Sequence, residues 1–338
     1  MSAVVFDQVN IVFGDKPEAA LPLMDAGQSR AEIQEATGQV LGVHDCSLSV
    51  EEGEILVLMG LSGSGKSTLL RAVNGLNPVC RGSVTVNDGD WSCDPGSCSE
   101  EDLRRVRRDC VAMVFQQFGL LPWRDVRDNV AFGLEVSGLS KSERYSKADE
   151  QLALVGLSDW SERKVSELSG GMQQRVGLAR AFATDAPILL MDEPFSALDP
   201  LIRTRLQDEL LELQAKLKRT IIFVSHDLDE AFKIGNRIAI MEGGRIVQCG
   251  TPQEIIRNPA SSYVADFVAH MNPLGVLRAS DIMRPGTVEN TIDVFPDRPV
   301  QELMTILIET DKSLHVTDGK QTLGVISKTD VLRALGAG

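Results

Sequence analysis

The sequence has 338 residues and an apolar content of 43%, which predict two packed domains, one large and one small, and exclude wholesale disorder. Its 48 acidic and 34 basic residues give a net charge of −14, which argues against a dedicated nucleic-acid binder because such proteins carry a basic surface. No apolar run approaches the ~20 residues that cross a bilayer, and the N-terminus lacks the order of a signal peptide, so we expect a soluble, cytosolic chain. Six cysteines without C-x-x-C or zinc spacing are expected to be free thiols.

Apolar runs separated by turn residues predict a chain in which strands and helices alternate. In the N-terminal part we expect strands over residues 4–13, 46–50, 55–59 and 83–86, with a helical insertion over residues 17–38. Further along we expect strands over residues 111–115, 188–192 and 220–224, helices over residues 140–157 and 176–183, and a hairpin of residues 237–241 and 245–249. This alternation is typical of an α/β fold.

The segment Gly60-Leu-Ser-Gly-Ser-Gly-Lys-Ser67 has the spacing of a phosphate-binding P-loop. It follows an apolar strand and precedes residues 68–76, which we expect to be helical, so the setting that the motif requires is present. Glycines let backbone N–H groups point at phosphates, the helix N-terminus adds positive potential, Lys66 would meet the β- and γ-phosphates, and Ser67 would meet Mg²⁺. The residues expected to bind ATP here are Gly60, Ser62, Gly63, Ser64, Gly65, Lys66, Ser67 and Thr68.

A second glycine cluster, Leu168-Ser-Gly-Gly-Met-Gln-Gln-Arg175, precedes a helical pattern. Ser169 is placed to cap this helix. Gly170 and Gly171 would then expose the helix N-terminus, which predicts a second anion-binding position on the same chain.

Two acidic residues, Asp192 and Glu193, end the apolar strand of residues 188–192. A buried strand can simply end in a solvated acid. After a P-loop, however, Asp192 is interpreted as the carboxylate that holds Mg²⁺ in its second coordination shell, and Glu193 as the group that orients or deprotonates an attacking water.

The order of the motifs is more specific than any one of them. The P-loop is followed by a glutamine after a strand, by Leu-Ser-Gly-Gly-Met-Gln, by Asp-Glu, by Ser-Ala-Leu-Asp and by a histidine. The chain therefore resembles the ATP-binding subunit of an ABC transporter over about residues 1–270. The resemblance implies a P-loop NTPase with a mixed sheet core, an antiparallel β subdomain and a helical subdomain, in a nucleotide-binding domain of residues 1–273.

In this family two subunits face head to tail, and each ATP lies between the P-loop of one and the signature loop of the other. The resemblance implies that Phe13 stacks on adenine and that Gln116, or Gln117 in a register shifted by one, senses Mg²⁺ and the lytic water. It implies that Glu193 is the general base and that His226 touches the γ-phosphate. The signature side of the site would be formed by Ser169, Gly170, Gly171 and Gln173, the link between the two sites by Asp199, and the metal site by Ser67, Gln116 and Asp192.

Three segments make the chain similar to one group of ABC transporters in particular. The insertion between Phe13 and Val43, the segment Asp199-Pro-Leu-Ile-Arg203 and the segment Asp227-Leu-Asp-Glu-Ala231 are similar to those of bacterial importers of glycine betaine, choline and proline. The resemblance implies an ATPase that powers uptake of such a quaternary amine, glycine betaine, choline or proline betaine, for osmoprotection.

The tail, residues 274–338, is similar to one CBS motif, a β-α-β-β-α unit that forms a small α+β module. Gly324-x-x-Ser327-x-x-Asp330 matches the pattern in which a hydroxyl and a carboxylate bind an adenosine ribose. We expect that a single motif does not bury its sheet alone and pairs with its copy in a dimer. The sequence leaves open whether the module senses an adenine nucleotide or is a dimerising cap without a ligand.

The resemblance also implies partners and a location. The expected partners are a second copy of the chain, integral-membrane permease subunits and a periplasmic or lipid-anchored substrate-binding protein, with no nucleic acid. The expected location is the cytoplasmic face of the bacterial inner membrane, reached through the permease, which would contact the surface near residues 116–123. One alternative is an importer for another small solute. The other is a soluble ABC protein without transport, and the single P-loop and the acidity disfavour this second alternative.

Overall fold

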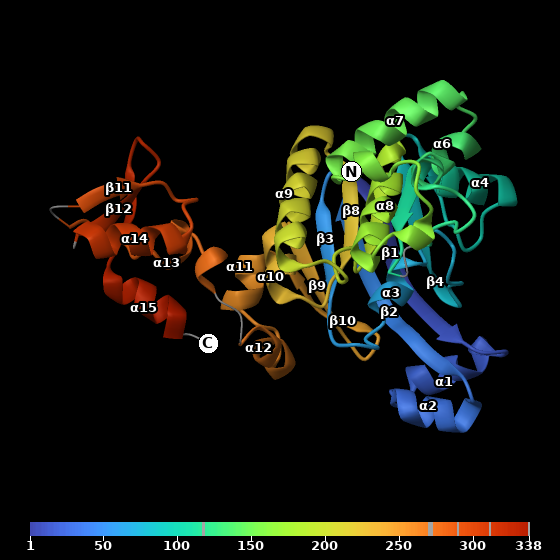
Figure 1. The fold of residues 1–338 in the computed structure, drawn as a ribbon. Helices are drawn as coiled ribbons and strands as arrows, with labels where there is room; N and C mark the ends of the chain where they lie inside the picture. The colour runs from blue at the N-terminus through green and yellow to red at the C-terminus, as the bar shows by residue number, and fades with distance from the viewer. Residues whose placement is uncertain (117–118, 270–272, 289–290, 311, 337–338) are drawn as a thin grey trace. The chain divides into compact units, whose positions relative to one another are not determined.

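The computed structural model describes residues 1–116, 119–269, 273–288, 291–310 and 312–336 (Figure 1). Contacts divide the chain into two compact units, the first with residues 1–226 and 239–246 and the second with residues 227–238 and 247–338. The boundary expected after residue 273, between the nucleotide-binding domain and the tail, stays a prediction. Over the described ranges, no helix combines the length and the apolar character needed to cross a bilayer.

A six-stranded sheet with the order β10-β9-β3-β8-β7-β6 lies mostly in the first unit. Its parallel strands are β3 (Ile55–Met59), β8 (Thr220–Val224), β7 (Ile188–Asp192) and β6 (Val111–Val114), and the hairpin of β9 (Arg237–Glu242) and β10 (Arg245–Gly250) extends it, as the sequence predicts. Every residue of β3, β7 and β8 is buried, which suits continuous apolar strands in a parallel sheet. Asp192 pairs with Val224, so the carboxyl ends of β7 and β8 lie together, where ligands bind in such sheets.

The second sheet of this unit is antiparallel, with the order β2-β1-β4-β5. It consists of β1 (Ser2–Phe13), β2 (Val40–Glu51), β4 (Arg81–Asp88) and β5 (Trp91–Cys93). The strand expected over residues 46–50 begins at Val40, because Phe13 pairs with Val40 across the hairpin.

The expected helical insertion closes the end of this hairpin. It contains a 3₁₀ turn (Pro17–Ala20), α1 (Leu21–Asp25) and α2 (Arg30–Thr37), which lie at the end of the β1–β2 ribbon in Figure 1. A small core buries Val12, Ala20, Met24, Ile33 and Leu41. The insertion is therefore a packed element joined to the strands.

Helices surround the parallel strands. After α3 (Lys66–Leu70) come α4 (Glu100–Arg105) with a π turn (Val106–Cys110), α5 (Val126–Val130), α6 (Phe132–Val136), α7 (Lys141–Leu154), short turns at Ser158–Trp160 and Val165–Glu167, α8 (Gly170–Ala183) and α9 (Pro200–Leu217). The helices α5, α6 and α7 pack against α8 and form the helical subdomain.

The second unit contains α10 (Leu228–Ile234), α11 (Pro252–Arg257), α12 (Ser262–Val268) and the tail. The tail follows the expected β-α-β-β-α order, with a turn at Pro273–Gly275, α13 (Ala279–Ile282), β11 (Thr291–Val294), α14 (Val300–Thr310), β12 (Ser313–Thr317), β13 (Thr322–Ile326) and α15 (Lys328–Gly336).

The tail sheet has the order β11-β12-β13 and buries one face within the chain. Leu314 and Val316 of β12 pack with Val300 and Leu303 of α14, while the alternate residues of β12 are only partly buried. The expectation that a single motif leaves its sheet unburied is therefore wrong for this face, because α13, α14 and α15 supply enough apolar side chains.

Candidate active site

The P-loop connects β3 to α3 through glycines that no other residue can replace without strain. Gly60 and Gly65 have φ angles of +142° and +101°. A Cβ added at Gly60 would collide with the Met241 carbonyl oxygen, and one added at Gly65 would lie 2.6 Å from the Gly42 carbonyl oxygen. The loop therefore needs glycine both for its backbone conformation and for close packing.

The helix after the P-loop differs from the prediction. It was expected over residues 68–76, but α3 begins at Lys66 and its regular part ends at Leu70. So short a helix contributes little dipole, and the phosphate binding predicted for this segment would therefore depend mainly on the loop amides and the Lys66 ammonium. The Lys66 side chain is buried, and its Nζ donates to the carbonyl oxygens of Gly60 at 2.8 Å and Leu61 at 3.0 Å. Burial lowers the pKa of Lys66, and the nearby Glu193 and Asp192 oppose this change.

Ser67 and Asp192 meet at the carboxyl end of β7. The Ser67 hydroxyl donates to Asp192 Oδ1 at 2.6 Å, and Arg71 Nη2 contacts Asp192 Oδ2 at 2.8 Å. Asp192 has no exposed surface, so it is a buried carboxylate satisfied from both sides. Arg71 is a residue of this site that the sequence motifs do not indicate. Its signal was the spacing of four residues from Ser67, which places both on one helix face.

The Glu193 carboxylate lies beside two other predicted residues, Gln116 and His226. Its Oε2 accepts a hydrogen bond from Gln116 Nε2 at 3.1 Å and lies 3.3 Å from His226 Nδ1. The Glu193 backbone has a φ of +49°, a strained conformation for a residue with a side chain. The alternative glutamine, Gln117, lies outside the described residues. Strain of this kind concentrates at functional sites, and here it aims the carboxylate at the position shared by Gln116 and His226.

The second glycine cluster forms the start of α8. Ser169 caps this helix by accepting the Met172 N–H at 3.3 Å, and Gly170 is exposed, as the sequence predicts. Gln173 donates from Nε2 to the carbonyl oxygens of Val165 and Leu168, both at 3.2 Å. The Gln173 amide nitrogen is thus used to hold its own loop, whereas it was expected among the residues that contact ATP.

Comparisons with known proteins agree with this arrangement. A family model described as ABC transporter matches residues 43–196. The glycine betaine/proline betaine transport system ATP-binding protein of Salmonella typhimurium is 48% identical over 326 residues, 96% of this chain and 80% of that protein. The trimethylamine N-oxide transport system ATP-binding protein of Ruegeria pomeroyi is 45% identical, covering 96% of this chain and 94% of that protein.

Among solved structures, a dimeric bacterial ABC transporter cassette superposes with a TM-score of 0.64 at 28% identity and covers 74% of this chain and 98% of that one. The same cassette is also known bound to ADP and Pi after hydrolysis. This chain belongs to the ABC transporter ATP-binding proteins. It is an ABC ATPase, and permease partners follow from its membership in this family of transport components.

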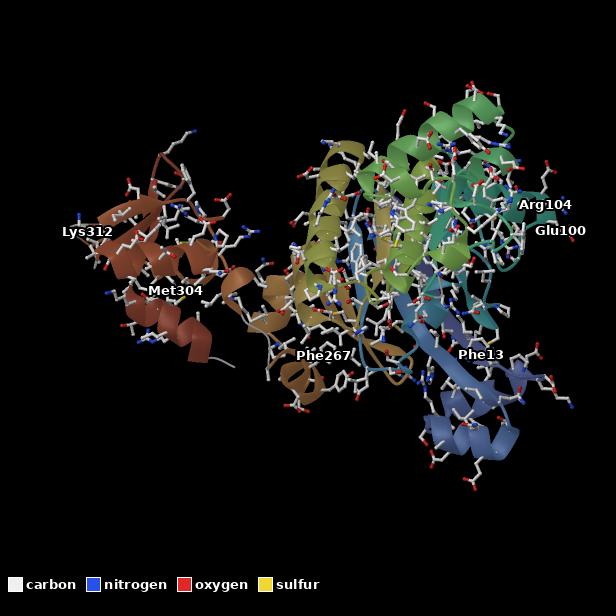
Figure 2. The ribbon with its side chains drawn as sticks, in the orientation of Figure 1. Phe13, Glu100, Arg104, Phe267, Met304 and Lys312 are labelled. Carbon is white, nitrogen blue, oxygen red and sulfur yellow. The ribbon has the colours of Figure 1, made fainter. Side chains whose placement is uncertain are left out.

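Phe13 of this ABC ATPase lies at the end of β1, and Figure 2 labels it on the β1–β2 ribbon. Its side chain is 39% exposed. A Cβ added at Gly42 would lie 2.9 Å from the Phe13 ring and 3.1 Å from the Thr68 methyl group, so the ring reaches the P-loop side of β2. An exposed aromatic face beside the phosphate loop fits the adenine-stacking role predicted for Phe13.

Gln174 of the ABC ATPase was missed by the sequence analysis. It is 1% exposed, donates from Nε2 to the Glu193 carbonyl oxygen at 3.2 Å, and accepts the Ala197 N–H at 3.1 Å. It therefore joins α8 to the backbone of Glu193 and to the loop that ends at Asp199. Asp199 itself caps α9 by accepting the Ile202 N–H at 3.0 Å.

A cavity of about 400 Å³ lies beside the segment that starts at Gln116. Its lining includes Arg107, Phe115, Gly119, Leu121, Phe132 and Val136. Trp123, in the same segment, is 71% exposed and so is not a core residue. Part of the predicted segment, Gln117 and Phe118, lies outside the described residues. The ABC ATPase thus has an apolar hollow at the surface where the permease was expected.

Proposed function

We propose that this ABC ATPase powers uptake of a small methylated ammonium compound, with glycine betaine as the first candidate. This substrate class is supported by similarity to glycine betaine transport proteins over nearly the whole chain. Relatives named for glycine betaine transport, from Salmonella typhimurium and Bacillus subtilis, are 48% and 46% identical over 96% and 97% of this chain. The ATPase does not touch the solute, so membrane and binding-protein partners would select it.

The proposal is tested by uptake of labelled glycine betaine and choline in a strain that lacks this gene, at low and high osmolarity. The intact gene should restore uptake, and a Lys66→Ala variant should not. Restored uptake of neither compound would reject the substrate class while leaving the ATPase assignment in place.

Trimethylamine N-oxide is a second candidate. The relative named for its transport in Ruegeria pomeroyi has 94% of its own length covered, against 80% for the Salmonella protein. Both solutes carry a methylated nitrogen centre. Competition by unlabelled trimethylamine N-oxide in the same uptake assay distinguishes them, since a cognate solute competes at lower concentration.

In the proposed reaction, water attacks the γ-phosphorus of ATP in line with the leaving ADP. Glu193 accepts the proton of the attacking water, Gln116 holds the carboxylate and the water in place, and His226 contacts the γ-phosphate. Lys66 would exchange its present carbonyl contacts for the β- and γ-phosphates. The contacts at 3.1 and 3.3 Å around Glu193 Oε2 support this division of roles.

Mg²⁺ fits the oxygen donors at the end of β7. Ser67 and Asp192 offer a hydroxyl and a carboxylate, which are ligands that hard cations prefer. Gln116, the third proposed ligand, makes its observed contact with Glu193. When bound, Mg²⁺ would neutralise charge on the β- and γ-phosphates. Arg71 would keep Asp192 oriented from the opposite side.

We further propose that two copies close head to tail over two ATP molecules, with Ser169, Gly170 and Gly171 facing the partner's P-loop. The exposed cap of α8 supports this, because fourteen residues of helix give its N-terminus a substantial dipole. Ser169→Arg and Lys66→Ala should each be inactive alone. Their mixture should regain activity, since the P-loop of one and the signature loop of the other form an intact site. Full activity of Ser169→Arg alone would reject the shared site.

The cavity beside Gln116 is proposed as the permease contact, which would place the chain at the cytoplasmic face of the inner membrane. A short apolar helix from the permease would fill the volume of about 400 Å³ near Leu121 and Phe132. A cysteine introduced at Val136, a lining residue that is 57% exposed, should form crosslinks to permease but not to the binding protein.

The CBS-like tail is proposed as a dimerising cap. Its candidate ribose ligands already bind one another: Asp330 Oδ2 accepts from the Ser327 hydroxyl at 2.6 Å, and Arg284 Nε contacts Asp330 Oδ1 at 2.6 Å. Nucleotide would have to break these contacts. Exposed apolar side chains, Phe295, Ile308 and Leu332, are available for pairing. Sedimentation of the full chain with Ile308→Glu should show weaker dimers in the absence of ATP, and titration with AMP or ATP should give no tail-dependent binding.

A further inference from the structure

One side chain of the insertion reaches the P-loop. Arg30, the first residue of α2, donates from Nη1 to the Gly63 carbonyl oxygen at 2.7 Å and from Nη2 to the Gly42 carbonyl oxygen at 2.6 Å. Gly63 belongs to the P-loop and Gly42 to β2. One planar guanidinium therefore connects α2, the P-loop and β2. Because both of its terminal nitrogens are hydrogen-bonded, it has little freedom to move.

The same guanidinium lies against the turn between β9 and β10. A Cβ added at Gly244 would lie 2.6 Å from Arg30 Nη2. Gly244 donates its own N–H to the Ser64 carbonyl oxygen at 3.1 Å, so this turn is bonded to the P-loop as well. Arg30 thus bonds to the P-loop at Gly63 and lies against Gly244, which is itself bonded to Ser64 of the same loop.

The insertion is built to hold Arg30 in this position. Ser29 and Glu32 form a reciprocal capping box around the first turn of α2, and Ile33 is buried in the core of the insertion. These contacts fix the start of the helix from which Arg30 projects.

We propose that Arg30 is a positioning residue for the ATP site, through which the insertion holds the P-loop in its phosphate-binding conformation and sets the affinity for ATP. Glycine-rich loops lose much conformational freedom when they close on phosphates, and a loop held beforehand binds more tightly. Arg30 also places a permanent positive charge beside a loop that binds a polyanion. The inference rests on the proposed ATP-binding role of the P-loop.

The test uses the full chain with three substitutions, measuring ATP affinity with a fluorescent ATP analogue and steady-state hydrolysis. Arg30→Gln should raise the Kd and KM for ATP about tenfold, or about 1.4 kcal/mol, with kcat at saturating ATP within about twofold of the parent. Arg30→Lys, which supplies charge without a fork, should raise them about threefold. Arg81→Gln is the control, because Arg81 anchors the insertion elsewhere, through Asp25 at 2.8 Å, and should change Kd less than about twofold.

Hydrogen exchange gives a readout that general destabilisation does not produce. Arg30→Gln should speed exchange in residues 60–66 and leave β8 unchanged. Should Arg30→Gln prove insoluble, Arg30→Lys carries the test, and an unchanged KM overturns the inference.

Two other results overturn the inference. They are unchanged ATP affinity in Arg30→Gln, and equal losses in Arg30→Gln and Arg81→Gln, which would assign the effect to docking of the whole insertion. Lys66→Ala separates this from the proposed function. Loss of ATP binding in Lys66→Ala with none in Arg30→Gln rejects only the role of Arg30, whereas undiminished binding in Lys66→Ala rejects the P-loop assignment itself.

Discussion

Replacing Glu193 by glutamine removes a proton acceptor and its negative charge while keeping the shape of the side chain. The side chain keeps its size, and its amide oxygen can still accept from Gln116, which now lies 3.1 Å from the carboxylate. What is lost is the basic oxygen at the point that Gln116 and His226 share. General base catalysis typically contributes 10²–10⁴-fold, so turnover should fall by about that factor, equivalent to about 3–5 kcal/mol.

ATP binding should survive this substitution. The contacts proposed for Lys66 with the phosphates and for Ser67 with Mg²⁺ do not involve the replaced atom, so the Kd for ATP should stay within about threefold of the parent value. Dimers that form with ATP should then persist, because the reaction that opens them is slow. Phosphate release at saturating ATP, titration with a fluorescent analogue and size-exclusion chromatography with ATP measure the three quantities.

The matched control is Glu100→Gln on α4, which Figure 2 labels next to Arg104. Glu100 pairs with Arg104 at 2.9 Å at the surface, and its side chain is 88% exposed, so the same chemical change there should leave turnover unaltered. Normal hydrolysis by Glu193→Gln would refute the assignment of the base. A hundredfold loss of ATP affinity would show instead that this side chain is needed to bind nucleotide.

Four further predictions follow from single contacts. Lys66→Ala should abolish measurable ATP binding. In the parent protein, ATP affinity should decline with rising pH before the ordinary lysine pKa of ~10.4 is reached, because burial lowers the pKa of Lys66. A titration of Kd against pH measures this decline, and a flat profile up to that pH would contradict it. Gly42→Val should displace the Phe13 ring, whose edge would lie 2.9 Å from the new Cβ. The loss of stacking on adenine should weaken nucleotide binding by about 1–3 kcal/mol, and unchanged affinity in a titration would argue against contact between Phe13 and adenine. Gln174→Ala should lower the free energy of unfolding by about 1–3 kcal/mol and lower kcat, because the Glu193 carbonyl and the Ala197 N–H lose their buried partner. Chemical denaturation and phosphate release measure the two effects, and a stable, fully active variant would argue against a role for these hydrogen bonds. Burial acts to raise the pKa of Asp330, but hydrogen bonds from Ser327 and the contact with Arg284 lower it overall. The ionised carboxylate therefore stabilises the tail at neutral pH, and this stabilisation is lost as the pH falls through the lowered pKa. Asp330→Asn should remove this acid dependence, measured as amide exchange in residues 322–336, and an identical acid profile in the variant would argue against it.

Local sequence patterns were sufficient to predict the main site motifs and the positions of the buried strands. The P-loop, the signature cluster and the Asp192-Glu193 pair are each contiguous, and their chemistry depends on spacing within a few residues. Buried parallel strands such as β3 and β7 are continuous apolar runs, so their positions were also predicted closely. The order of the motifs along the chain was sufficient to indicate the ABC family before any contact was known.

Contacts between distant segments were decided only by the tertiary structure. Arg71 and Asp192 are separated by 121 residues, and Arg30 and Gly63 by 33, and no periodicity relates them. Packing of strands and helices likewise decides the Glu193 backbone strain, the bonds of Gln174 to the backbone of Glu193 and Ala197, and the early end of α3. Side-chain partners across such distances are set by the approach of whole elements. A local pattern can therefore supply the reacting groups, while packing determines which other residues orient them.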